Sequence, residues 1–454
     1  MKTEMLDVNQ SMAGPAKDTE KRTCFRWVVG VLIFVIYTIA GADRANLGFV
    51  LPFIRKEFHM SNAQAGSLAS AYLISYAIFQ LPTGFACARW GVRKIFTAGM
   101  VLTSMFTGLI GTSTSSFLIK VYRFGLGIGE APVGVGIPAT INQWFPPKEK
   151  GTMGGVYFAA IKFGPVIVPI IGAMIIQRFS WHAVFYFFAA PGLLLSAVWY
   201  WLVKNDPAES PYCSRKEVEY IKSGEAPAKR ETAKPKAAVS RGWLDKLCRI
   251  RPVKPIETTT GMFFSWNVLG IAIGYFCIVG IVNVILTWIP TYLMQVKGYP
   301  IMTMGIVASM PWIGGVAGNL VGGWASDTIF AQRRKPTMLI MSLSTCFMAY
   351  AMIYAPNGAM LLSILLFALG FLLNVGYAGF MVYLMKLTTK EKYPIAYALI
   401  NTFGQVGGAC AAVLAGVVLD KFNWDMVFIF IAGYSALCFV VLLTIVEPMK
   451  HAEA

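Results

Sequence analysis

Charged residues are scarce in this sequence. Asp, Glu, Lys and Arg make up only 13% of its 454 residues, whereas 56% are hydrophobic and the mean hydropathy is +0.60. Soluble domains carry roughly 25% charged residues, so this composition excludes a soluble globular protein of this length. A chain this apolar is expected in a lipid bilayer.

Patterns that hold metals, disulfides or reactive groups are missing as well. The three histidines (His59, His182 and His451) are isolated, and the eight cysteines show neither a CxxC pair nor metal-ligand spacing. The chain also lacks a phosphate-binding loop and a nucleophile motif. We therefore expect no metal site, no cofactor and no enzymatic activity. The first 26 residues lack the apolar core of a cleaved signal peptide.

Long apolar runs are what the sequence has instead. A helix that crosses the hydrocarbon layer needs about 20 apolar residues, and continuous runs favour helices over the alternating strands of a β-barrel. The sequence therefore predicts an all-α polytopic membrane protein, with twelve transmembrane helices in two pseudo-symmetric six-helix bundles. The expected spans are residues 27–53, 63–85, 95–113, 116–144, 151–178, 183–203, 261–295, 302–326, 337–355, 358–386, 394–421 and 424–446.

A basic hydrophilic segment separates the first six spans from the last six. Short motifs recur in the same order on its two sides, and such echoes indicate a duplicated transporter unit. The loop 84–94 is echoed by 323–335, and 179–185 by 422–428. The expected organisation is an N-terminal tail (1–26), an N-terminal bundle (27–203), a linker (204–260), a C-terminal bundle (261–446) and a C-terminal tail (447–454).

The distribution of Lys and Arg predicts the orientation of the chain. These residues gather in the loops after even-numbered spans, for example at Arg89, Arg93 and Lys94, and positive loops stay on the cytoplasmic side. Both termini are therefore predicted to be cytoplasmic. The formal net charge of +17 follows from this topology, so nucleic acid is not expected as a partner.

The few charges inside the predicted spans lie in the N-terminal half: Asp43, Arg44, Arg123, Glu130 and Lys162. Each costs about 2.5–3.5 kcal/mol near the bilayer centre, so such residues usually face a cavity and have a function. Arg123 and Glu130 are seven residues apart and share one helix face. Asp43 and Arg44 are adjacent and point about 100° apart, so one can meet the fourth helix while the other meets a substrate.

These charges suggest proton coupling and anion binding. We hypothesise that Asp43 and Glu130 bind protons and that Arg123 forms and breaks an ion pair with them. Arg44 is assigned to a substrate carboxylate, because its planar guanidinium suits bidentate recognition. The alternative is a static salt bridge that joins helices 1 and 4. Lys162 is either a second cation for an anionic substrate, a lysine that extends to the membrane surface, or the partner of a carboxylate.

Several motifs resemble a known family. The loop 84–94 and its counterpart resemble the marker of the major facilitator superfamily. Residues 43–46, 122–131, 144–151 and 286–293 resemble its anion:cation symporter group, in particular bacterial sugar-acid members that take up galactonate, glucarate and hexuronates with protons. The resemblance implies proton-coupled uptake of a galactonate- or hexuronate-type anion by alternating access, in the bacterial inner membrane, and we expect a monomer.

The resemblance also implies roles for particular residues. It supports the same four charged roles and places substrate contacts at Tyr76 and Asn401. It assigns gating to the basic turns, although Ala88 stands where the family has an aspartate. Gly41 and Ile161 replace a tyrosine and a glutamine of the sugar-acid members. The gating candidates are Arg89, Arg93 and Asp327.

Amide and phenol groups are the expected readers of substrate hydroxyls. Each of them is also explained by hydrogen bonding between packed helices, and the basic turns by topology alone. The alternatives for the whole chain are a uniporter or exporter of organic anions on the same fold and, in another class, a non-transporting membrane sensor or enzyme. The hydroxyl-reading candidates are Tyr76, Gln80, Tyr275, Asn283, Asn374, Tyr377, Asn401 and Gln405.

Overall fold

The computed structural model describes residues 22–223, 249–253, 256–389 and 392–449. Twelve of its helical segments are long and apolar enough to cross a membrane, which confirms the predicted fold class. The helices of the first half are α1 (Phe25–Glu57), α2 (Asn62–Trp90), α3 (Val92–Gly111), α4 (Ser116–Trp144), α5 (Pro147–Arg178) and α6 (Trp181–Leu202). Those of the second half are α10 (Trp266–Gln295), α11 (Ile301–Thr328), α12 (Lys335–Ala351), α13 (Ala359–Asn374), α14 (Tyr377–Leu387), α15 (Tyr393–Lys421) and α16 (Trp424–Thr444).

Short elements follow each half. Between the halves lie the 3-10 turn η1 (Pro207–Glu209), the helix α7 (Arg215–Ser223), the strand β1 (Ile250–Pro252) and the helix α9 (Thr259–Phe264). The turn η2 (Met352–Tyr354) extends α12, and the strand β2 (Glu447–Met449) ends the described chain. β1 and β2 pair in parallel, with Ile250 opposite Glu447. The sequence also echoes residues 148–150, before the fifth span, at residues 390–392, before the eleventh, and residues 390 and 391 of this motif lie outside the described residues.

Local sequence signals begin several of these helices. Ser61 forms a capping box with Gln64 at the start of α2, and Ser115 accepts a hydrogen bond from the Leu118 N–H at the start of α4. Such caps satisfy amide groups that have no partner within the helix. Between α2 and α3, Gly91 adopts a φ of 86°, which favours glycine. The turn can therefore be only one residue long.

Two expected spans are broken. Residues 261–295 form α9 and α10, which meet at Ser265, and residues 358–386 form α13 and α14, which are separated at residues 375–376. At the second break, a Cβ on Gly376 would lie 2.6 Å from the Thr337 carbonyl oxygen of α12. The close approach of another backbone is a tertiary effect, so hydropathy alone predicted one continuous helix.

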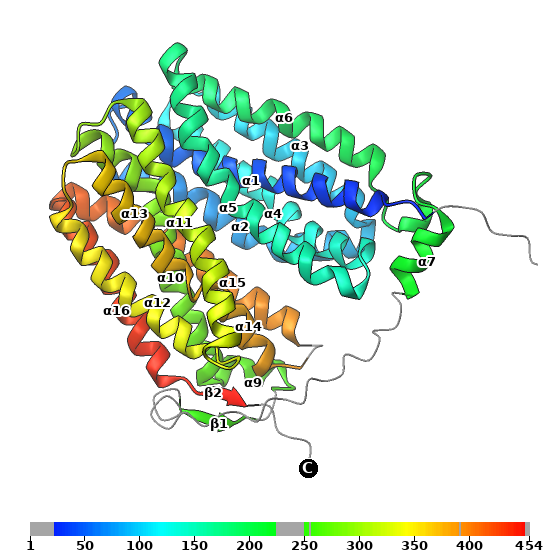
Figure 1. Ribbon diagram of the computed structural model, residues 1–454. Coiled ribbons are helices and arrows are strands. Elements are labelled where there is room, and N and C mark those ends of the chain that lie inside the picture. The colour runs from blue at the N-terminus through cyan, green and yellow to red at the C-terminus, as the bar shows by residue number, and fades with distance from the viewer. Residues whose placement is uncertain (1–21, 224–248, 254–255, 390–391, 450–454) are drawn as a thin grey trace, which may run out of the picture.

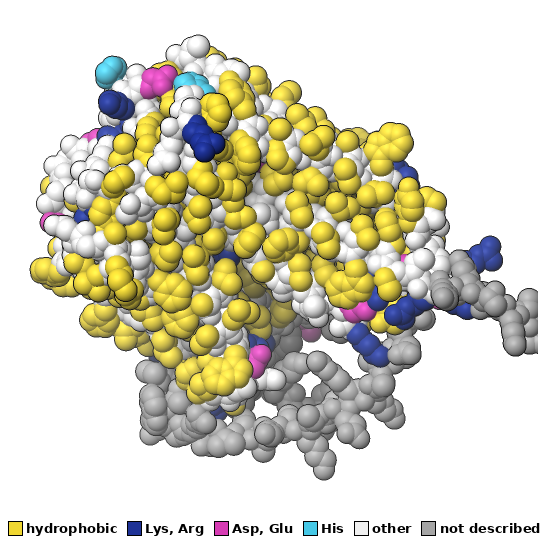
Figure 2. All heavy atoms as spheres, turned by 45° about the horizontal axis from the view of Figure 1, so that its top comes forward, with side chains coloured by type: hydrophobic (Ala, Val, Ile, Leu, Met, Phe, Trp, Pro, Cys, Tyr) yellow, Lys and Arg dark blue, Asp and Glu magenta, His cyan; other side chains and the backbone are white. Residues whose placement is uncertain are grey.

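The outer surface matches a lipid environment. In Figure 2, hydrophobic side chains cover most of the visible face, and charged side chains gather mainly towards its two ends. Large apolar residues face outward, including Leu194 (70% exposed) and Trp201 (74% exposed). This pattern is the reverse of a soluble surface and suits contact with acyl chains.

The two halves are in contact at one end and apart at the other. Where α1 leads into α2, the Asp420 carboxylate of α15 accepts hydrogen bonds of 2.8 Å from the backbone N–H groups of Asn62 and Ala63. Nearby, the Ser309 hydroxyl of α11 donates to the Val166 carbonyl of α5 at 2.9 Å. The halves diverge towards the end that carries α7 and α9 (Figure 1). With the predicted orientation, the open end faces the cytoplasm.

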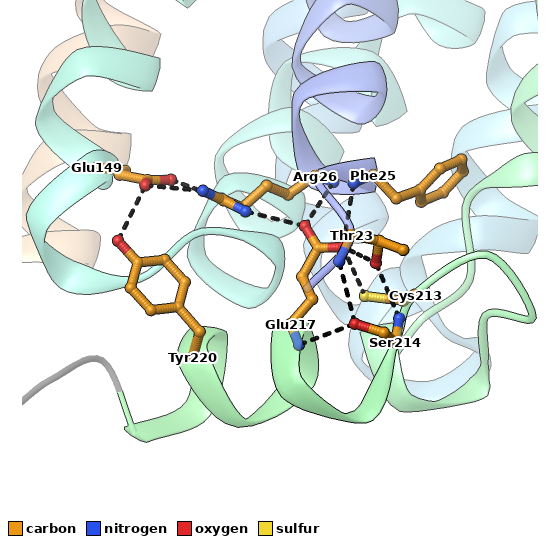
Figure 3. A network of polar contacts seen from close by, with 8 residues as sticks. All are labelled: Thr23, Phe25, Arg26, Glu149, Cys213, Ser214, Glu217 and Tyr220. Atoms are coloured by element: carbon orange, nitrogen blue, oxygen red, sulfur yellow. Dashed lines mark hydrogen bonds and ion pairs between the residues drawn. The ribbon is translucent and has the colours of Figure 1, made fainter. Parts of the chain in front are cut away.

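A polar network attaches α7 to the N-terminal half (Figure 3). The Glu217 carboxylate is fully buried and accepts from the Thr23 hydroxyl at 2.5 Å, the Phe25 N–H at 3.0 Å and the Arg26 guanidinium at 3.0 Å. Arg26 also donates to Glu149 of α5 at 2.8 Å. The start of α1 is thereby bound both to α5 and to the segment that follows α6.

Candidate functional site

The N-terminal charges converge within the membrane interior. The Arg44 Nε of α1 donates to Glu130 Oε1 of α4 at 2.6 Å, and Nη2 lies 2.6 Å from the same oxygen. Glu130 is fully buried, whereas the Arg44 side chain is 23% exposed. A buried ion pair of this kind is costly to form and costly to break on one side only. Its cation is therefore the part of the pair that a ligand can reach.

Tyr72 connects the two charged residues of α4. Its hydroxyl donates to Glu130 Oε2 at 2.7 Å, and the Arg123 guanidinium lies 4.8 Å from its ring centroid. Gly127 makes this geometry possible, because a Cβ there would overlap the backbone of α2 at Tyr72. The seven-residue spacing of Arg123 and Glu130 thus places them around one phenol.

Asp43 lies behind this group. It is 2% exposed, and its Oδ1 has no hydrogen-bond partner among the described residues. Arg123 reaches it through the backbone, because Nη1 donates to the Asp43 carbonyl oxygen at 3.1 Å. In this structure Glu130 pairs with Arg44. Within the described chain, Arg123 forms no ion pair with Asp43 or Glu130.

A cavity of about 110 Å³ adjoins the cluster. Arg44, Arg123 and Lys162 line it from the N-terminal half. From the other half it is lined by α10, α11, α14 and α15, through residues that include Asn283, Trp312, Tyr377 and Gln405. The cavity therefore lies between the halves, where a transported molecule would have to bind.

Lys162 occupies a different wall of this cavity. Its side chain is 8% exposed, and Nζ lies 4.9 Å from the ring centroid of Tyr377 and 5.7 Å from that of Trp312. Ile161, which precedes it, packs so closely on α1 that a Cβ on Gly41 would lie 2.9 Å from its carbonyl oxygen. A tyrosine at position 41 would not fit this crossing. The two departures from the sugar-acid members are therefore in contact.

The predicted hydroxyl readers form hydrogen-bonded pairs. Asn401 donates to Gln80 of the other half at 2.8 Å, and Gln405 lies 3.5 Å from Asn401. Tyr275 bonds Tyr377 through their hydroxyls at 3.0 Å. Tyr76 is buried beneath Arg44, whose guanidinium lies 5.1 Å from the phenol ring. Asn283, which lines the cavity, donates to the Val279 carbonyl of its own helix at 2.9 Å.

The predicted gating residues bond within their own halves. Arg93 donates to the Tyr200 carbonyl at 2.6 and 2.8 Å, and Asp327 pairs with Arg334 at 2.8 Å. The Arg89 guanidinium lies 5.6 Å from the ring of the adjacent Trp90. For the described residues, none of these contacts crosses between the halves, as expected at an end where the halves are apart.

Tyr72 and Trp312 are among the cavity residues that were not predicted from the sequence. Tyr72 precedes Tyr76 by four residues and so lies on the same face of α2. This spacing was a sequence signal from which Tyr72 could have been predicted. Trp312 carries no such signal, because an apolar residue in an apolar helix is indistinguishable from a packing residue. In the described part of the chain, no group of three or more His, Cys, Asp or Glu side chains is placed to hold a metal ion.

Comparison with known proteins agrees with this architecture. The sequence model described as "Major Facilitator Superfamily" matches residues 33–409 and, in a second match, 303–454. The "Probable galactarate/D-glucarate transporter GudP" of Bacillus subtilis (strain 168) is 27% identical over 95% of this chain and 94% of its own. The "D-galactonate transporter" of Escherichia coli O6:H1 is 25% identical over 94% and 96%. A solved bacterial homolog of the lysosomal transporter Spinster, inward-facing and occupied, matches with a TM-score of 0.72, 14% identity and coverage of 94% and 98%.

Proposed function

Because this chain belongs to the major facilitator superfamily, we propose that it takes up a sugar-acid anion together with protons by alternating access. The observation that carries the proposal is the Arg44–Glu130 ion pair at the wall of the central cavity, 2.6 Å long and buried on its acidic side. The names of the similar transporters, galactarate/D-glucarate and D-galactonate, support a sugar acid as the substrate class.

Substrate binding and protonation assist each other in this arrangement. A substrate carboxylate competes with Glu130 for the Arg44 guanidinium, which recognises carboxylates in a bidentate manner. Glu130 would then be a buried carboxylate without its cation, and keeping it charged is costly. Uptake of a proton removes that cost. Anion binding therefore favours proton binding, which is the thermodynamic requirement for symport.

Asp43 is the second proton site of the proposal. It is buried, and one of its carboxylate oxygens lacks a hydrogen-bond partner in the described chain. A bound proton would remove the cost of holding a charge there. Arg123 spans the distance between the two acids, since it bonds the Asp43 backbone and lies over Tyr72, which bonds Glu130.

Transport requires the cavity to open to each side in turn. The contacts of Asp420 with the start of α2 support a closed outer side in this conformation. Rocking of the halves would break them and bring the inner ends together. The resemblance to bacterial sugar-acid transporters favours the bacterial inner membrane and a monomer, and the basic loops favour cytoplasmic termini.

Uptake by reconstituted protein tests the proposal. Proteoliposomes with an inward proton gradient are expected to accumulate galactonate, galactarate or a hexuronate, and dissipation of the gradient with an ionophore should abolish accumulation. Glu130→Gln and Asp43→Asn should remove gradient-driven accumulation but retain exchange of labelled for unlabelled substrate. Glu149→Gln, outside the cavity, is the matched control. Uptake that does not depend on the proton gradient would indicate a uniporter and contradict proton coupling.

A further inference from the structure

The charges of the cavity do not balance without a substrate. Three cationic side chains line it, Arg44, Arg123 and Lys162, and no carboxylate is among the described residues that line it. Glu130 neutralises Arg44 from behind the wall. Of the other two cations, Arg123 of α4 adjoins Asp43, whose carbonyl oxygen it bonds, and Lys162 comes from a different helix, α5.

Lys162 is the more isolated of these two. Lys162 is only 8% exposed. Among the described residues, no carboxylate lies within ion-pair distance of its ammonium. The rings of Tyr377 and Trp312 offer cation–π contacts, at 4.9 and 5.7 Å from their centroids. Such contacts stabilise a cation only weakly, and they do not offset the free-energy cost of burying its charge.

We propose that Lys162, seated on Tyr377 and Trp312, binds a second anionic group of the substrate. This inference rests on the proposed function, in which Arg44 binds the first carboxylate. The preferred substrate is then a sugar acid with a carboxylate at both ends, an aldarate, rather than one with a single carboxylate. One carboxylate would bind Arg44 and the other Lys162, and the hydroxyl groups of the substrate would lie between these two side chains.

The position of Lys162 suits this role. The carbonyl oxygen of the preceding residue, Ile161, packs against Gly41 of α1. Because Gly41 lies about one helical turn before Arg44, α5 contacts α1 close to the Arg44 side chain. A ligand that reaches both cations would bridge α1 and α5 of one half and the aromatic residues of α11 and α14 in the other. Lys162 would therefore read the far end of the substrate at the interface that moves during transport.

Galactarate and galactonate form a matched pair for the test, because they differ only in whether the sixth carbon is a carboxylate or a hydroxymethyl group. Binding to purified protein is measured by calorimetry for the wild type, Lys162→Gln and Lys162→Arg. The wild type is expected to prefer galactarate at least tenfold. Lys162→Gln should lose at least tenfold for galactarate and less than threefold for galactonate, whereas Lys162→Arg should retain the preference. Lys297→Gln, outside the cavity, is the control.

The possible results distinguish failure of the Lys162 inference from failure of the proposed function. Equal weakening of both acids in Lys162→Gln, or equal wild-type affinity for the two acids, would show that Lys162 only braces α5 against α11 and α14. Either result overturns the inference and leaves the proposed function standing. Failure of the wild type to bind either acid would contradict the proposed function and the inference with it. Should Lys162→Gln not fold, Lys162→Met and Lys162→Arg give the same comparison.

Discussion

The two halves of the molecule share one helical plan but differ in the chemistry they bring to the cavity. The N-terminal half contributes Arg44, Arg123 and Lys162, with Glu130 and Asp43 behind them. The lining from the C-terminal half consists of aromatic, amide and apolar side chains. On the proposed function, charge recognition and proton exchange would therefore occur in the N-terminal half, while the C-terminal half would select by shape and hydrogen bonding. The two halves would then have different tasks despite their shared plan.

The largest effect is expected from removing Arg44, the cation of the buried Arg44–Glu130 pair, which tests whether the N-terminal half recognises the charge of the substrate. Arg44→Gln leaves Glu130 without its partner, and breaking a buried pair from one side costs about 3–5 kcal/mol. Uptake of a sugar acid into proteoliposomes should fall at least about 100-fold, because the substrate carboxylate loses its charged partner, a loss of about 2–5 kcal/mol in binding. Arg178→Gln, at the exposed end of α5, is the control.

The double variant Arg44→Gln/Glu130→Gln sharpens the result. It removes both charges, so thermal stability should recover while uptake stays low. If Arg44→Gln transports normally, the ion pair is merely structural and the assignment of the charged wall fails.

The C-terminal half should behave differently. Asn401→Ala removes the amide that bonds Gln80 across the halves at 2.8 Å. Loss of one neutral hydrogen bond costs about 1 kcal/mol, so KM for the sugar acid should rise about five- to tenfold while uptake remains driven by the proton gradient. Asn357→Ala, in the α12–α13 loop, should have no effect. Loss of proton dependence in Asn401→Ala would break the comparison, because coupling would then involve both halves.

A smaller effect is expected at the outer closure, where the two halves must separate. Asp420→Ala removes both acceptors for the amide groups of Asn62 and Ala63. Stabilisation of a helix N-terminus by a carboxylate is worth about 1 kcal/mol, so the population open on that side should rise about fivefold.

Spin labels at Lys56 and Lys421, both exposed, measure this population through the distance between them. Asp425→Asn, exposed in the first turn of α16, serves as the control. An unchanged distance distribution in Asp420→Ala would show that apolar packing alone closes this end.

The sequence was sufficient for the features that depend on local chemistry. Twelve spans follow from hydropathy, and the membrane charges of the N-terminal half were identified because each is costly in lipid. It was harder to predict which of these charged residues pair with each other. Arg44 and Glu130 lie 86 residues apart, and their pairing depends on how α1 and α4 are rotated against each other. Likewise, the break between α13 and α14 lies where the backbone of α12 packs against Gly376, a contact that hydropathy does not reveal.

The contact between Glu217 and Thr23 shows the same limit, since these residues are 194 positions apart. A hydrophilic linker gives no hydropathy signal for a docked helix. The strand β2 was likewise assigned to a tail, because a three-residue strand is recognisable only beside its partner β1.

Both halves nevertheless share one feature at the open end, a buried glutamate that follows the last span. Glu217 binds the chain before α1, whereas Glu447 accepts from the backbone of Arg334 and Lys335 at the start of α12 and from Lys386 at 3.1 Å. Glu217→Gln and Glu447→Gln should each destabilise their own half by about 2 kcal/mol, because buried amide groups lose a charged acceptor. Each thermal midpoint should fall by a few degrees.

The pH dependence distinguishes the Glu217 contact from simple packing. Burial alone raises the pKa of Glu217, but hydrogen bonds from Thr23 and from the Arg26 backbone and guanidinium outweigh it, so the pKa lies below its ordinary value of 4.5. A carboxyl whose pKa is lowered by folding contributes stability above its ordinary pKa and loses it as the pH falls through the lowered value. The difference in thermal midpoint between wild type and Glu217→Gln should therefore be full at pH 7 and shrink as the pH falls below 4.5. Glu209→Gln, exposed in the same segment, should show no difference at either pH, and a Glu217→Gln effect that does not change with pH would mean that shape, not charge, holds α7 to the N-terminal half.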